Sequence, residues 1–79
     1  MKNEYVKLIK VLREDEDLID LDVKGYELIR QNNSDYTLRF FYKDQEHHVV
    51  VTEDDINYNK LGIILKIERY IDERYNTAN

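Results

Sequence analysis

A run of carboxylates between residues 14 and 22 is the part of the sequence best suited to chemistry or binding. Six acidic side chains lie within nine residues with no basic side chain among them: Glu14, Asp15, Glu16, Asp17, Asp20 and Asp22. Carboxylates at this density can hold a hard cation such as Ca²⁺, or present a negative surface to a basic partner. A solvated loop that keeps the protein soluble is the third interpretation.

Of the three interpretations of the acidic run, a calcium site agrees least with the spacing of its residues. Asp20, Asp22 and Gly25 follow the first, third and sixth positions of an EF-hand loop. However, the fifth position is Lys24 and the twelfth is Gln31, where an oxygen ligand and a bidentate Glu are required. We therefore expect no metal and no other cofactor.

A second acidic group, Glu53, Asp54 and Asp55, follows Thr52. This order is typical of a helix start, because Thr caps free N–H groups and acids favour the positive end of the helix dipole. The group has a sufficient structural explanation. It adds to the field of the first run only if both lie on one side of the protein.

Other residue types give no catalytic pattern, so we expect no enzyme. His47 and His48 are adjacent on a predicted strand, so they point to opposite faces and cannot chelate one metal together. The chain has no Cys and no Gly-rich phosphate loop. Among the seven tyrosines, Tyr58 and Tyr75 fall outside the main apolar stripe of the last helix and are expected to be exposed.

Apolar periodicity predicts one α+β domain over residues 1–79, a two-layer helix–three-stranded antiparallel meander–helix (αβββα) fold. Helical spacing of apolar residues marks the first and last segments, and alternation marks three strands between them. A β-bulge at Lys24 and Gly25 accounts for a shift in the alternation. The expected elements are a helix over 2–14, strands over 18–31, 36–43 and 46–52, a helix over 54–75 and a frayed tail over 76–79.

One face of the predicted sheet has no helix to cover it. The second strand turns one set of side chains to the helices, which places Arg39, Phe41 and Lys43 on the open face. An exposed Phe41 beside a valine of the third strand would form an apolar patch. This face is therefore a candidate surface for homodimers or for binding another protein.

Composition narrows the class of partner. The 79-residue chain carries a net charge of −5, which argues against direct binding to nucleic-acid phosphates. No stretch approaches the roughly 20 apolar residues of a membrane helix, and no apolar signal core opens the chain. We expect a cytoplasmic protein, and the excess of residues with AT-rich codons suggests a low-GC bacterium or its phage.

The predicted layout, size and charge resemble the small acidic proteins that phages and mobile elements use against host defences. In particular, they resemble the compact acidic anti-CRISPR inhibitors of Cas9 and DNA-mimic inhibitors. The resemblance assigns no role to individual residues. It implies a cytoplasmic inhibitor that occupies a basic nucleic-acid-binding groove of a host enzyme. The alternatives are an acidic antitoxin, or a homo-oligomeric accessory protein that assembles through its open sheet face or an edge strand.

Overall fold

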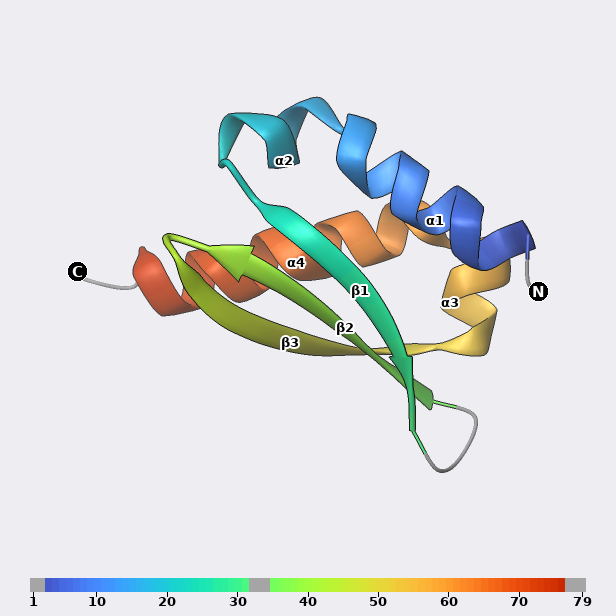
Figure 1. Ribbon diagram of the computed structural model, residues 1–79. Coiled ribbons are helices and arrows are strands. Elements are labelled where there is room, and N and C mark those ends of the chain that lie inside the picture. The colour runs from blue at the N-terminus through green and yellow to red at the C-terminus, as the bar shows by residue number, and fades with distance from the viewer. Residues whose placement is uncertain (1–2, 32–34, 77–79) are drawn as a thin grey trace.

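A computed structural model describes residues 3–31 and 35–76 and has the predicted α+β architecture. Helices α1 and α4 cover one face of a three-stranded antiparallel sheet whose strand order is β1-β2-β3 (Figure 1). The elements in chain order are α1 (Asn3–Glu14), α2 (Glu16–Asp20), β1 (Lys24–Arg30), β2 (Asp35–Tyr42), β3 (Gln45–Thr52), α3 (Glu53–Tyr58) and α4 (Lys60–Tyr75).

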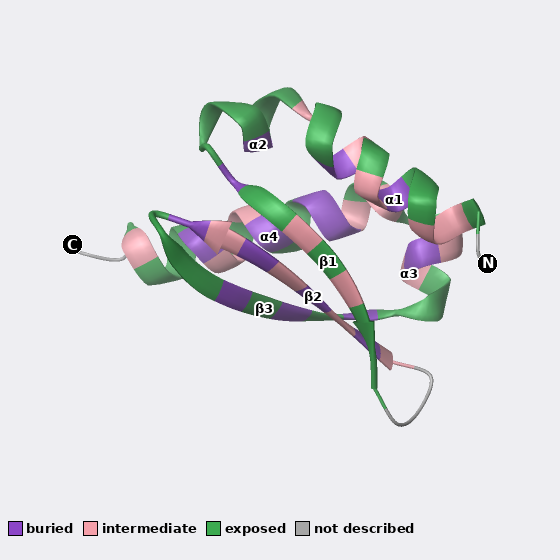
Figure 2. Ribbon diagram, in the orientation of Figure 1, coloured by how far each residue is buried: buried purple, intermediate pink, exposed green. Residues whose placement is uncertain are grey.

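The sheet follows the predicted alternation along β2 and β3 (Figure 2). Side chains of both strands that face the helices are buried, and those of β3 that face away are exposed. Lys43 and Asp44 join the two strands with positive φ angles of 53° and 64°. Two such residues make the tight hairpin turn whose twist matches that of the strands. The buried set is Tyr36, Leu38, Phe40, Tyr42, His47, Val49 and Val51.

The β-bulge at the start of β1 is confirmed. The pairing of β1 with β2 shifts register between Lys24 and Glu27, and Gly25 has a φ of 72°. A Cβ atom at Gly25 would lie 2.7 Å from Cδ1 of Phe41. Glycine is therefore required both by the left-handed backbone and by the ring that packs over it.

The strand predicted to begin at residue 18 is wrong over its first six residues. Residues 16–20 form the short helix α2, and β1 begins only at Lys24. The Asp15 carboxylate caps this helix by accepting a hydrogen bond of 3.0 Å from the Leu18 amide. Leu18 is fully buried, whereas Ile19 is 55% exposed, so the apparent alternation did not mark a buried face.

The helix predicted over 54–75 is divided in two at Asn59, which ends α3 and caps α4. Its Oδ1 atom accepts a hydrogen bond of 3.2 Å from the Gly62 amide. Gly62 therefore lies in the first turn of a helix, and not in a helix interior as the single-helix prediction requires. The predicted tail at 76–79 begins with Asn76, the C-cap of α4, and its remainder lies outside the described residues.

Candidate acidic binding site

The acidic run (Glu14, Asp15, Glu16, Asp17, Asp20 and Asp22) lies on and around α2, at the C-terminal end of α1. Three of its members are placed by the local structure of this short helix. Asp15 is the N-cap, and Glu16 and Asp17 occupy the first turn, where the helix dipole favours negative charge. Asp22 follows the helix with a φ of 63°. A capped helix therefore holds these carboxylates in fixed positions.

Helix α4 adds two further carboxylates from the other end of the sequence. A surface hollow of about 680 Å³ lies between α2 and α4, and we call it the acidic groove. Its acidic lining comes from both helices, and Arg69 is the one basic residue among its described lining residues. Leu21 and Leu65 give it an apolar part and are 36% and 52% exposed. The acidic lining residues are Asp17, Asp20, Glu68 and Asp72.

Carboxylates of the two helices crowd one another at the wall of this groove. Asp15, Asp17 and Glu68 each place a carboxylate oxygen within 4.8 Å of the others. Burial raises the pKa of Glu68, and the negative charges of Asp17 and Asp15 raise it further. Burial also raises the pKa of Tyr26, again with a contribution from Asp15. The carboxylates of α2 and α4 therefore disfavour one another's ionisation at this wall.

Few cations neutralise this surface. Asp22 lies 3.6 Å from Nζ of Lys24, a pair in which both side chains are largely exposed. Exposed pairs of this kind contribute little to stability. The other five members of the acidic run form no salt bridge with any residue in the described ranges: Glu14, Asp15, Glu16, Asp17 and Asp20.

The trio of Asp15, Asp17 and Glu68 is also the arrangement in which the described residues could hold a metal ion. Three carboxylate oxygens suit a hard cation such as Ca²⁺, which takes six to eight oxygen ligands. The trio would supply part of such a shell. Asp20 and Gly25, which the EF-hand spacing aligned, lie at the end of α2 and in β1, and they share no coordinating loop.

The second acidic group forms the first turn of α3, which lies near the N-terminal end of α1, away from α2 (Figure 1). Asp55 belongs to a capping box with Thr52, in which each side chain accepts from the other residue's amide. Glu53 and Asp54 line a shallow hollow with Tyr58, which is 84% exposed as predicted. The two acidic groups therefore do not share one surface.

The open sheet face differs from the apolar patch expected there. Phe41 is only partly exposed, because Gly25 lies against one side of its ring and the Arg39 guanidinium lies 5.1 Å from its centroid. Arg39 is itself held by Glu27 at 2.8 Å and by the Gly25 carbonyl at 2.9 Å. Lys43 lies in the hairpin turn, beside the ring of Tyr42. The candidate dimer face at Arg39, Phe41 and Lys43 is thus largely occupied by its own side chains.

The sequence analysis did not single out Glu68 and Asp72, which lie within the helix predicted over 54–75. They stand about 50 residues from the acidic run and share a face of α4 with Leu61 and Leu65. The exposed leucines were the one available signal. A helix side that mixes exposed leucines with acids differs from an ordinary solvated surface.

Comparisons of the chain with models of protein families, with curated proteins and with solved structures find no significant match. Within the described residues, no helix is both long enough and apolar enough to cross a membrane.

Proposed function

We propose that this protein is a small acidic binding module that docks a basic surface of another protein through its acidic groove. The observation that carries the proposal is the convergence of Asp17 and Asp20 from α2 with Glu68 and Asp72 from α4 on one hollow. Like charges brought together from two helices disfavour folding. A role in binding a basic partner would explain why the fold keeps like charges that lower its stability.

The chemistry of the groove favours a protein over a metal or a small molecule as partner. Carboxylates spaced along two helices match the charge of lysines and arginines in a nucleic-acid-binding groove. The exposed Leu21 and Leu65 add an apolar surface to the groove. A partner protein can cover this surface with apolar side chains while its basic residues meet the carboxylates. We therefore infer an inhibitor of the anti-CRISPR or DNA-mimic type, acting in the cytoplasm of a bacterial host on a nucleic-acid enzyme.

The test is competition for a basic protein partner. Immobilised protein is incubated with a low-GC bacterial lysate at low salt, and bound proteins are eluted first with a salt gradient and then with duplex DNA. We expect a nucleic-acid-binding enzyme that DNA displaces. The variant Asp17→Asn, Asp20→Asn, Asp72→Asn should retain at least tenfold less of it, because three charges of the docking surface are gone.

A matched control removes charge at the other end of the molecule. Glu53→Gln with Asp54→Asn leaves the Thr52–Asp55 capping box intact and lowers the net negative charge without touching the groove. This control should bind like the unmodified protein. Equal loss in both variants would mean that total charge alone governs binding, and equal retention in both would remove the acidic groove from the proposal.

Calcium provides a second discrimination. Isothermal titration with CaCl₂ measures whether Asp15, Asp17 and Glu68 prefer a cation to a protein. We expect no heat of binding below millimolar calcium. Micromolar affinity that disappears in Glu68→Gln would replace the protein-binding proposal with a calcium site.

A further inference from the structure

The outer edge of the sheet at β3 is open to another strand. Beyond the two-residue turn, Gln45, His47, Val49 and Val51 pair with β2 through their backbone groups, because hydrogen-bonded pairs alternate along an antiparallel ladder. The backbone groups of His48 and Val50 therefore point away from the sheet. An edge strand of this kind can pair with another chain.

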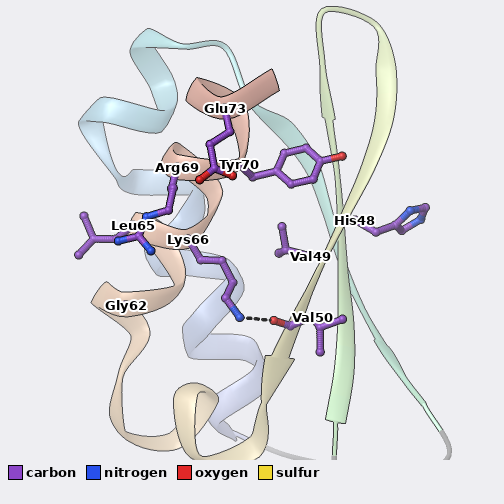
Figure 3. Close-up of a pocket in the computed structure, with 9 residues that line it drawn as sticks. All are labelled: His48, Val49, Val50, Gly62, Leu65, Lys66, Arg69, Tyr70 and Glu73. Carbon is purple, nitrogen blue, oxygen red and sulfur yellow. Dashed lines mark hydrogen bonds between the residues drawn. The ribbon is translucent and has the colours of Figure 1, made fainter. Parts of the chain in front are cut away.

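A side chain of α4 reaches this edge. Nζ of Lys66 donates a hydrogen bond of 2.6 Å to the Val50 carbonyl (Figure 3). Lysine at an edge strand is a common way to keep such an edge from pairing. However, this bond is exposed, so a competing backbone N–H can replace the lysine at small cost.

A hollow of about 510 Å³ runs between β3 and α4, and we call it the edge groove. Val50 and Leu65 contribute exposed apolar surface, at 54% and 52% exposure. Lys66, Arg69 and Glu73 project from α4 around it, as Figure 3 shows. Among the described lining residues, Lys66 and Arg69 outnumber Glu73 in this hollow, whereas in the acidic groove four acidic residues accompany Arg69 alone.

Two of the three charged side chains that α4 supplies to the edge groove, Lys66 and Glu73, are complementary to each other after a half-turn, whereas Arg69 of one copy would come near Arg69 of the other. Lys66 and Glu73 are seven residues apart, so they lie two turns from each other on one side of α4. The midpoint between them falls at Arg69 and Tyr70, and Tyr70 lines the groove together with Val49. A two-fold axis at this level would bring Lys66 of each copy to Glu73 of the other.

We propose that two copies of this chain pair through their β3 edges into one continuous six-stranded sheet. The register sets His48 opposite Val50 of the second copy, so that their outward N–H and carbonyl groups bond. Lys66 leaves the Val50 carbonyl and pairs with Glu73 of the second copy. The two α4 helices lie antiparallel on the same side of the sheet, and the interface is the same patch on both copies.

This dimer is independent of the proposed function. Asp17, Asp20, Glu68 and Asp72 line a hollow that includes α2 and none of β3; it shares Leu65 and Arg69 with the edge groove, but neither Lys66 nor Glu73. A dimer would present two acidic grooves. Failure of the edge pairing leaves the acidic groove untouched, and the reverse also holds.

The test is a charge-reversal exchange followed by sedimentation equilibrium between 5 µM and 1 mM. The unmodified protein should change from 9.6 kDa to twice that mass as concentration rises. Lys66→Glu and Glu73→Lys should each weaken self-association at least tenfold, because each sets like charges opposite one another. An equimolar mixture should restore a heterodimer, because Glu at 66 of one chain then meets Lys at 73 of the other, while Glu73 of the first chain meets Lys66 of the second.

Matched controls carry the same change in net charge elsewhere. Lys10→Glu and Asp54→Lys alter exposed residues of α1 and α3 and should dimerise like the unmodified protein. Val50→Pro should abolish the dimer while keeping the fold, since it removes an N–H that points away from β2. A monomer at 1 mM, dimers of either single variant at full strength, or a mixture that stays monomeric would each overturn the proposal.

Discussion

Glu68 is a residue whose charge opposes folding. Burial and the carboxylates of Asp17 and Asp15 raise its pKa above the ordinary value of 4.5. The folded protein therefore holds this proton more tightly than the unfolded chain does. Protonation stabilises the fold, and stability is lost as pH rises through the raised pKa.

The first prediction follows from the raised pKa of Glu68. Glu68→Gln should raise Tm at pH 7 by about 2–5 °C, because the charge is absent and the side chain keeps its size. The gain should shrink as pH falls toward 4, where Glu68 of the unmodified protein becomes neutral. Thermal unfolding by circular dichroism at pH 4, 5.5 and 7 measures it. A gain that is the same at all three values would contradict the assignment.

His47 fixes the C-terminal half of α4 to the sheet. Its Nδ1 and Nε2 atoms each lie 3.0 Å from a hydroxyl, those of Tyr70 and Tyr75, and its ring packs on Phe40. Tyr75 is half-buried for this reason, so the expectation that it would be exposed was wrong. Helical spacing alone did not reveal a partner on another strand.

The second prediction concerns these two hydrogen bonds. His47→Phe keeps an aromatic ring and removes both, which should cost about 1–2 kcal/mol of the free energy of unfolding. His48→Phe is the matched control, because His48 is exposed and its pair with Glu46 is worth little. Urea denaturation at low micromolar concentration should show a loss in the first variant only. Equal losses would mean that the hydroxyl contacts are not stabilising.

At the scale of elements, the division between α3 and α4 depends on two residues. A Cβ atom at Gly62 would lie 2.3 Å from Nδ2 of Asn59, the side chain that caps α4. Glycine at 62 therefore leaves room for the cap, although alanine is the better helix former by about 1 kcal/mol.

The third prediction is a coupling between these positions. Gly62→Ala alone should destabilise the protein, because Asn59 must leave its capping position. In an Asn59→Ala background, where cap and clash are both absent, the same change should stabilise by about 0.5–1 kcal/mol. Four urea titrations complete the double-mutant cycle. Additive effects, with no coupling, would show that the cap does not constrain Gly62.

The elements that sequence predicted correctly are those with a strong period. β2 alternates without a break, so its two faces could be predicted from the sequence. The register of the hairpin could not, because the turn expected at 44–45 between strands 36–43 and 46–52 lies one residue earlier, at Lys43 and Asp44. Helix α2 was missed because five residues are too few for a helical period. Its signal was the cap at Asp15 followed by Glu16 and Asp17, the same pattern that correctly marked the start of α3.

At the scale of the whole molecule, the candidate site could be predicted only in part. Two of the four carboxylates of the acidic groove, Asp17 and Asp20, are close in sequence and were found as part of the acidic run. The other two, Glu68 and Asp72, join them because α1 and α4 run side by side in the same direction (Figure 1). Lys60 and Glu4 fix this alignment at one end with a contact of 2.6 Å. This alignment brings α2 to the second half of α4, a relation that periodicity does not contain.

The fourth prediction follows from this separation of charge. Uncompensated carboxylates gather at the α2 end, whereas the Lys60–Glu4 pair at the other end is an attractive contact that lowers the pKa of Glu4. Salt screens both, but repulsion among several charges outweighs one partly exposed pair. Raising KCl from 20 to 300 mM should therefore raise Tm by a few degrees. Asp17→Asn with Glu68→Gln should reduce that rise by about half, and an unchanged salt response would show that the repulsion is spread over the whole surface and not gathered in the acidic groove.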